Sequence, residues 1–212
     1  MSRVADAGLS RLAFAALVAG LAVLIGVVVW AGWTYPGYDH TRQFMSELGA
    51  TGAVTGRTVS IWGFVPNSVL MTVFGVLAAW ILRHSALAVT ACLMLAAFGV
   101  GMTGGGVYPC DFECSRSDPS PASFRHDVFG GVGYLCAILG VGLASLWARR
   151  SDAPGLARLG LVAVIVSVVG FYGVIAEVER AGLFQRAMES AIAVFMLALG
   201  WMLMRGLRSG RS

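Results

Sequence analysis

The stretch "LAFAALVAGLAVLIGVVVWAGW", residues 12–33, contains no charged side chain and consists almost wholly of apolar and small residues. An α-helix rises 1.5 Å per residue, so about 20 such residues cross a hydrocarbon core about 30 Å thick. Arg3 and Arg11 precede the run, as basic residues precede the apolar core of a signal peptide. Its length, with Trp30 and Trp33 at its end, favours a retained helix. The stretch therefore predicts a membrane-spanning helix.

Similar runs recur along the whole chain of 212 residues, of which 58% are hydrophobic and only 12% charged. Such a composition excludes an ordinary water-soluble domain. The predicted spans are 12–33, 58–82, 85–108, 128–148, 159–176 and 187–204. No polar segment between them is long enough to bury a core of its own. The sequence predicts an all-α integral membrane bundle of six transmembrane helices that forms a single domain over residues 1–212.

Charge is distributed unevenly between the two ends of this predicted bundle. The end with both termini carries nine arginines and two acids, a net +7, whereas the opposite loops carry six arginines and nine acids, a net −3. By the positive-inside rule both termini are cytoplasmic, in the inner (plasma) membrane. Attraction to anionic lipids explains the overall charge of +4, so we expect membrane lipids as partners and no nucleic acid. A protein partner or self-association is left open.

The first outer loop contains "HTRQFMSELGATG", residues 40–52, which has the pattern of a short helix and its end. On a helical wheel Phe44, Met45 and Leu48 fall on one side and polar residues on the other, and Gly49 follows as a stop signal. We expect a short interfacial helix along the outer surface of the bundle.

Two further signals lie within the predicted spans. Pro66 removes a backbone donor and should bend the second helix, and Asn67 beside it places an amide at membrane depth. That amide either bonds to a neighbouring helix or contacts a ligand. Gly101 and Gly105, four residues apart, are typical of closely packed helices.

Cys110 and Cys114 bracket three residues of the second outer loop. On the oxidising side of a membrane this spacing favours a disulfide over a metal site, and both remain open. Cys92 and Cys136 lie inside predicted spans, where a thiol behaves as a small apolar group.

His40 and His126 both fall on the outer side, near the mouth of the bundle, and suggest a composite site. Imidazole with carboxylates suits a divalent metal such as zinc, although ordinary hydrogen bonds are the alternative and no cofactor is certain. The acids that could join them are Glu47, Asp127, Glu177 and Glu189. The candidates for catalysis are His40, Ser46, Glu47, His126 and Asp127. The candidates for ligand contact are Asn67, Glu177 and Glu189, the last near the start of the sixth span.

The order of these motifs resembles a known family. A histidine and "SELGATG" in the first outer loop, an asparagine early in helix two, "YP" closing helix three and a histidine opening helix four resemble the bacterial and archaeal domain of unknown function number 998. The resemblance implies a six-helix membrane protein and no particular reaction. It points to His40, Ser46, Leu48, Gly49, Asn67, Pro109 and His126, and the Cys110 and Cys114 pair is not part of the pattern.

Three functions fit these residues. The first is a membrane protein whose polar, outward-facing mouth binds a lipid headgroup, a small solute or a partner. The second is a membrane-embedded metal-dependent hydrolase acting on a lipid or envelope substrate, with its metal on His40 and His126. The third is a transporter, for which only Glu189 and Asn67 provide polar groups at depth. Whether the protein is an enzyme stays open.

Overall fold

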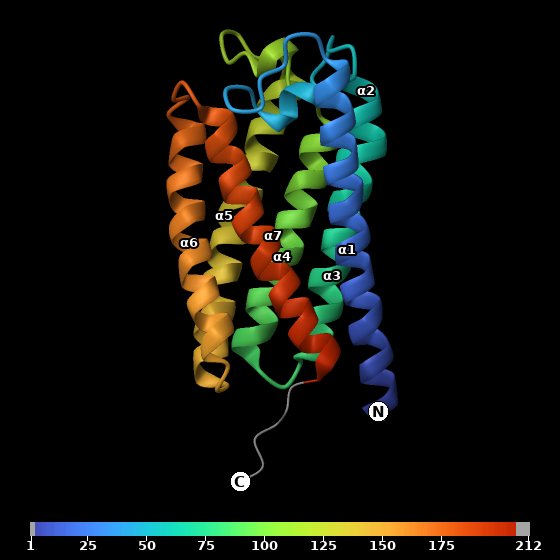
Figure 1. Cartoon of the computed structure of the whole chain (residues 1–212), viewed down its shortest axis with the longest axis vertical. Coiled ribbons are helices and arrows are strands. Elements are labelled where there is room, and N and C mark those ends of the chain that lie inside the picture. The colour runs from blue at the N-terminus through green and yellow to red at the C-terminus, as the bar shows by residue number, and fades with distance from the viewer. Residues whose placement is uncertain (1–2, 207–212) are drawn as a thin grey trace.

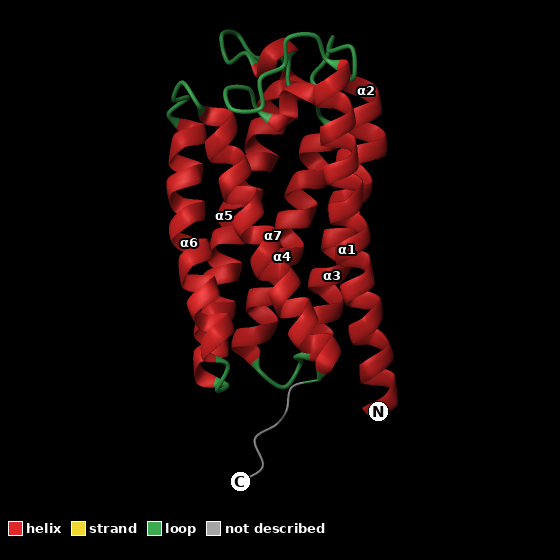
Figure 2. Cartoon of the chain, in the orientation of Figure 1, coloured by secondary structure: helices red, strands yellow, loops and turns green. Residues whose placement is uncertain are grey.

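The computed structural model describes residues 3–206, which form helices joined by loops without any strand (Figures 1 and 2). In chain order the elements are α1 (Arg3–Thr34), η1 (Met45–Gly49), α2 (Gly56–Thr58), η2 (Val59–Phe64), α3 (Val65–Ile81), α4 (Ala86–Val107), η3 (Phe112–Cys114), α5 (Pro121–Arg150), α6 (Pro154–Ile175) and α7 (Ala181–Arg205). Six helices are long and apolar enough to cross a membrane, counting α2, η2 and α3 as one. The prediction of six membrane-spanning helices is confirmed.

Four helices begin well before the charge-free runs that predicted them. Helices α1, α5, α6 and α7 start at Arg3, Pro121, Pro154 and Ala181, whereas the runs start at 12, 128, 159 and 187. The charge criterion removed first turns that are polar because they lie at an end of the bundle. Proline at the first helical position suits α5 and α6, since that position needs no backbone donor.

The six spanning helices form a ring in sequence order. Each packs against the next along the chain, and α7 returns to contact α1 (Figure 1). Helix α1 begins and α7 finishes at the same end of the bundle, which we call the terminal end. We call the opposite end, with residues 35–55, 108–120 and 176–180, the long-loop end. Arg208 and Arg211, counted in the charge bias, lie outside the described residues.

The contact between α1 and α7 is confined largely to the terminal end. There the rings of Phe14 and Trp201 lie 5.8 Å apart, and Gly200 sits against Phe14 and Phe74. In Figure 1, α7 runs obliquely from α6 at the long-loop end toward α1 at the terminal end. The two helices therefore diverge toward the long-loop end.

Close approach between α4 and α5 depends on glycine. A Cβ on Gly101 would lie 2.7 Å from Gly133 Cα and 2.7 Å from the Phe129 carbonyl oxygen, nearer than any side chain is tolerated. Gly105, one turn further, differs: its nearest neighbour is the His126 ring, at 3.7 Å. Only the first of the two glycines serves helix packing as its spacing suggested.

The region before Pro66 is irregular, as a proline inside a helix requires. Residues Val59–Phe64 form a π-helical segment in which the Val65 N–H donates to the Ser60 carbonyl oxygen, five residues back. The Ser68 hydroxyl donates to the Phe64 carbonyl oxygen at 2.6 Å. The wider turn accommodates the ring and the missing N–H of Pro66.

Candidate functional site

The loop between α1 and α3 folds over the long-loop end and is fastened to the start of α7. The N–H groups of Gly182 and Leu183 donate to the carbonyl oxygens of Arg42 and Thr41, at 3.0 and 2.8 Å. These donors belong to the first turn of α7, where a helix has no partners of its own. The loop therefore caps α7 and covers the bundle at this end.

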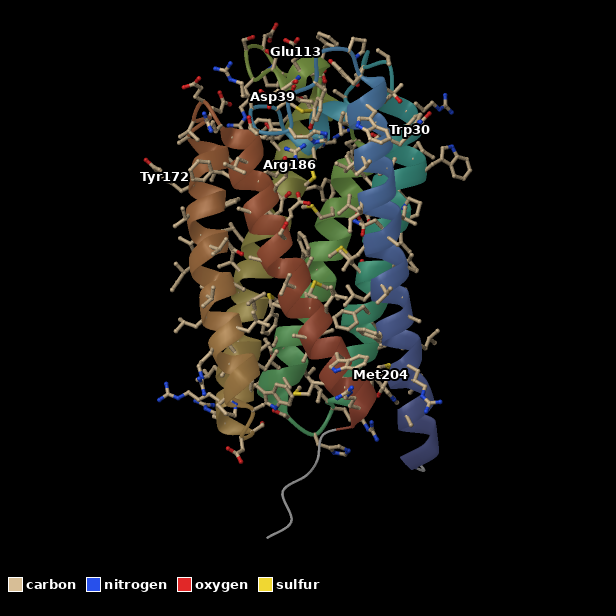
Figure 3. The ribbon with its side chains drawn as sticks, viewed as in Figure 1. Trp30, Asp39, Glu113, Tyr172, Arg186 and Met204 are labelled. Carbon is tan, nitrogen blue, oxygen red and sulfur yellow. A yellow bond between two sulfur atoms is a disulfide. The ribbon has the colours of Figure 1, made fainter. Side chains whose placement is uncertain are left out.

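Arg186 reinforces this attachment from the second turn of α7. Its guanidinium donates to the Gln43 carbonyl oxygen at 2.9 Å, to the Tyr38 hydroxyl at 2.7 Å and to His40 Nδ1 at 3.1 Å. A guanidinium only donates, so His40 Nδ1 is an acceptor. Burial, with the adjacent Arg186 charge, lowers the pKa of His40, and burial raises the pKa of Tyr38 to about 12. Figure 3 shows Arg186, Asp39 and Glu113 at this same end.

Glu47 supports the loop rather than facing solvent. Its carboxylate accepts from the Phe44 N–H and from Gln43 Nε2, both at 2.8 Å, and burial raises the pKa of Glu47. The short helix expected in this loop is present as η1, but Met45, Glu47 and Leu48 are all buried in it. Its expected position along the outer surface is wrong, because the loop folds inward to meet α7.

Beneath η1 lies a cavity of about 690 Å³, lined by every spanning helix except α6. Its two edges are α1, from Val18 to Val29, and α7, from Gln185 to Leu197. Ile25 of α1 and Val194 of α7 line the cavity and are 63% and 51% exposed, so neither is enclosed by the bundle. The cavity therefore opens sideways, through the gap where α1 and α7 diverge.

A polar cluster lies inside this mostly apolar cavity. The Tyr134 hydroxyl donates to a Glu189 carboxylate oxygen, and Gln185 Nε2 donates to the Tyr134 hydroxyl at 3.3 Å. Glu189 is eight residues into α7, which places it about 12 Å along the helix from its start. Glu189 thus lies inside the bundle and not in the first turn of its helix.

Asn67 and His126 also line the cavity. Asn67 is buried, and its Oδ1 atom has no hydrogen-bond partner among residues 3–206. His126 Nδ1 lies 2.8 and 3.1 Å from the carbonyl oxygens of Gly105 and Tyr108, which can only accept. Nδ1 therefore carries the proton, and Nε2 keeps its lone pair.

The remaining acids of the predicted site lie elsewhere. Asp127 and Glu177 face Arg116, with N···O distances of 3.8 and 2.8 Å, and all three side chains are substantially exposed. Exposed ion pairs of this kind contribute little to stability. They join α5 to the loop before α7 and take no part in the cavity lining.

Cys110 and Cys114 are joined by a disulfide that rests on Ser46, a cavity-lining residue of η1. The Cys114 sulfur lies 3.3 Å from Ser46 Oγ, and the Thr51 N–H donates to the Cys110 carbonyl oxygen at 2.8 Å. The ligand atoms of Cys110, Cys114 and His126 all lie within 4.8 Å of one another. Within the described part of the chain, this is the only group of three or more such residues.

The structure thus brings Ser46, Asn67, His126 and Glu189 to one cavity and places the cysteines beside His126. It does not gather His40 and His126 into one group of ligands, because His40 is held by Arg186. The sequence reasoning missed Tyr134 and Gln185. A tyrosine within an apolar run and a glutamine just before the last one were the available signals.

Comparison with known proteins identifies one family. The sequence model described as "Protein of unknown function (DUF998)" matches residues 13–202. No curated protein and no solved structure gives a match.

Proposed function

The chain belongs to the DUF998 family and is a multi-pass membrane protein, and we propose that it binds an amphiphilic lipid in the cavity between α1 and α7. The observation that carries the proposal is the sideways opening of a cavity that holds polar groups at its depth. A molecule entering through that opening comes from the membrane, since the helices flanking it are spans.

The apolar lining supports binding of the hydrocarbon part of such a lipid. Side chains such as Leu21, Met71 and Phe98 provide walls of the kind that contact alkyl chains. A volume of about 690 Å³ lies within the range of small-molecule sites, about 300–1,000 Å³. A hydrocarbon chain also extends naturally through the gap toward the surrounding bilayer.

The polar lining indicates the chemistry of the headgroup. The Asn67 amide oxygen, His126 Nε2 and the Glu189 carboxylate can accept hydrogen bonds. Arg186 also lines the cavity, but its guanidinium donates to Tyr38, His40, Gln43 and Gly182. A buried acceptor without a donor costs about 1–3 kcal/mol. A ligand that presents hydroxyl or amine hydrogens would donate to His126 Nε2 and, beside Tyr134, to Glu189, so we propose a hydroxyl- or amine-headed lipid.

Closure of the long-loop end supports entry from the membrane rather than from water. The loop between α1 and α3 covers that end and is bonded to α7 through Gly182, Leu183 and Arg186. If this end faces outward, as the charge bias suggests, the polar mouth expected from the sequence is roofed over. A water-soluble solute then has a less direct route than a lipid.

The two alternative functions receive less support. A hydrolase with its metal on His40 and His126 requires two rings at one ion, and His40 is bonded to Arg186 instead. A transporter requires ionisable groups along a path through the membrane. Between the cavity and the terminal end, the bundle is filled by apolar side chains, including Phe74, Phe195 and Leu199, which offer no such ionisable group.

The test is to identify lipids that stay with the protein after purification in mild detergent, by native mass spectrometry and lipid analysis. We expect about one hydroxyl- or amine-headed lipid per chain. Ala193 lines the cavity and Ala187, on the same helix, does not. Ala193→Phe should therefore lose the lipid, and Ala187→Phe should keep it. Equal lipid content in the two variants would contradict the proposal.

A further inference from the structure

We propose that Cys110, Cys114 and His126 form a redox-dependent site for a soft metal ion, Cu(I) or Zn(II). The ion binds when the two cysteines are reduced and is excluded when they are joined. This site differs from a metal centre on His40 and His126, and it lies at the long-loop end of the lipid cavity. The observation behind it is the convergence of two sulfurs and an imidazole from separate segments.

The arrangement needs little movement to accept an ion. Ligands about 2.0–2.3 Å from a tetrahedral ion lie roughly 3.3–3.8 Å from one another. The three ligand atoms already lie within 4.8 Å of one another with no ion present. To reach the required range, the bond between the sulfurs must open and the atoms farthest apart must approach by about 1 Å.

His126 is oriented as a ligating histidine should be. Its Nδ1–H is directed at the carbonyl oxygens of Gly105 and Tyr108, at 2.8 and 3.1 Å. Histidines that bind metals usually donate their second N–H to a carbonyl or carboxylate, which fixes the tautomer and the ring. The carbonyl oxygens of Gly105 and Tyr108, at the end of α4, accept that N–H here, so Nε2 is the ring nitrogen left to bind an ion.

The chemistry of the three donors selects the class of ion. Thiolates with an imidazole favour soft and borderline ions such as Cu(I) and Zn(II), whereas Mg²⁺ and Ca²⁺ require oxygen ligands. Three donors complete a trigonal Cu(I) site. For Zn(II) they leave a fourth position, and Ser46 Oγ lies 3.3 Å from the Cys114 sulfur on the side of the cavity.

The redox step balances with an external dithiol as reductant. Two electrons and two protons from the dithiol break the bond between Cys110 and Cys114 and give two thiols, while the dithiol becomes a disulfide. An ion that then binds displaces both thiol protons, because the thiolate is the ligand. Oxidation of the two sulfurs reverses the sequence and releases the ion.

The test uses the full chain in detergent, reduced with a phosphine under anaerobic conditions or left oxidised, and dialysed against Zn(II) or Cu(I) with a chromophoric competitor. We expect one ion per chain in the reduced protein and none in the oxidised protein. His126→Ala should weaken binding at least tenfold and Cys114→Ser should abolish it, whereas His40→Ala and Cys136→Ser should leave it unchanged. The competitor gives the affinity of the reduced protein for each ion.

Two results would overturn the proposal. The first is equal metal content in the reduced protein and in a Cys110→Ser, Cys114→Ser double variant. The second is unchanged affinity in His126→Ala and in His126→Gln, each checked for folding by size-exclusion chromatography. Ala193→Phe should keep the metal while losing the lipid, so the two proposals can fail separately.

Discussion

Burial of the Glu47 carboxyl group sets its pKa, and so makes stability depend on pH. Burial raises its pKa above the ordinary value of 4.5, so the folded protein binds more protons than the unfolded chain between these two pKa values. The free energy of unfolding should therefore fall as the pH rises through that window. Glu47→Gln should flatten this part of the curve, measured as Tm in detergent from about pH 4 to about pH 7.

Asp111 provides a control of opposite sign. The Ser120 N–H donates to its Oδ2 atom at 2.7 Å and lowers the pKa of Asp111. Its contribution to stability is present above the unfolded pKa and is lost as the pH falls. Asp111→Asn should reduce stability at neutral pH and not in acid. If it changed the dependence of Tm on pH in the same direction as Glu47→Gln, the lowered pKa of Asp111 would be contradicted.

Asn67 should separate binding from stability. Its Oδ1 atom lacks a partner, which costs the folded state about 1–3 kcal/mol, so Asn67→Ala should not lower the free energy of unfolding while it lowers lipid occupancy. Ser167→Ala is the matched control, because Ser167 Oγ is also buried and unpartnered but does not line the cavity. Native mass spectrometry and Tm give the two readouts, and a large loss of Tm with unchanged lipid would contradict a binding role.

Individual residues also show the limit of reading a sequence locally. A helical wheel places Glu47 on a polar, outward face, yet Glu47 is buried because its carboxylate bonds to Phe44 and Gln43 in a tight 3₁₀ turn. Met45 donates its N–H to Gln185, 140 positions further along the chain. The periodicity of a short stretch of sequence cannot predict a contact with a residue so far along the chain.

At the scale of elements, the contact between α4 and α5 should be sensitive to one methyl group. Gly101→Ala forces a Cβ against the Gly133 and Phe129 backbones, so it should cost about 1–3 kcal/mol of stability. Gly131→Ala on α5 meets nothing within 4 Å and should be neutral or stabilising by about 0.5–1 kcal/mol. Unfolding in mixed micelles measures both, and equal effects would show that the two helices can move apart.

The existence of the six spans could be predicted because hydrocarbon thickness fixes a length that the sequence must match. The starts of α5 and α7 could not be predicted in the same way. Arg125, His126 and Asp127 belong to the first two turns of α5, and Arg186 belongs to the second turn of α7. Charged turns at the ends of spans are stable there, so absence of charge marks the membrane core and not the helix.

At the scale of the whole molecule, the charge bias predicts an orientation that fusions can test. A fluorescent protein that folds only in the cytoplasm should be active after residue 212, and alkaline phosphatase, active only outside, should be inactive there. Phosphatase inserted within residues 115–119 should be active. The reverse pattern would place the long-loop end in the cytoplasm and would remove the oxidising environment expected for Cys110 and Cys114.

The cavity belongs to the whole molecule and could be predicted only in its parts. Asn67, His126 and Glu189 could be selected as polar residues near apolar runs, and the structure places all three on one cavity. Their meeting depends on ring order, on the oblique path of α7 and on the fold of the first loop. Tyr134 became a partner of Glu189 only through that arrangement.

The order of the helices gives the ring a mechanical property. Five of the six contacts around the ring join neighbours in sequence, each pair tied by a connecting segment, whereas the contact between α1 and α7 closes the ring without one. Two contacts hold α1 and α7 together instead. Phe14 packs against Trp201 at the terminal end, and the first loop bonds to Gly182 at the long-loop end. Between these two contacts no connecting segment joins α1 to α7, so separating the two helices there would strain no loop, and the cavity opening lies where the ring has the fewest covalent restraints.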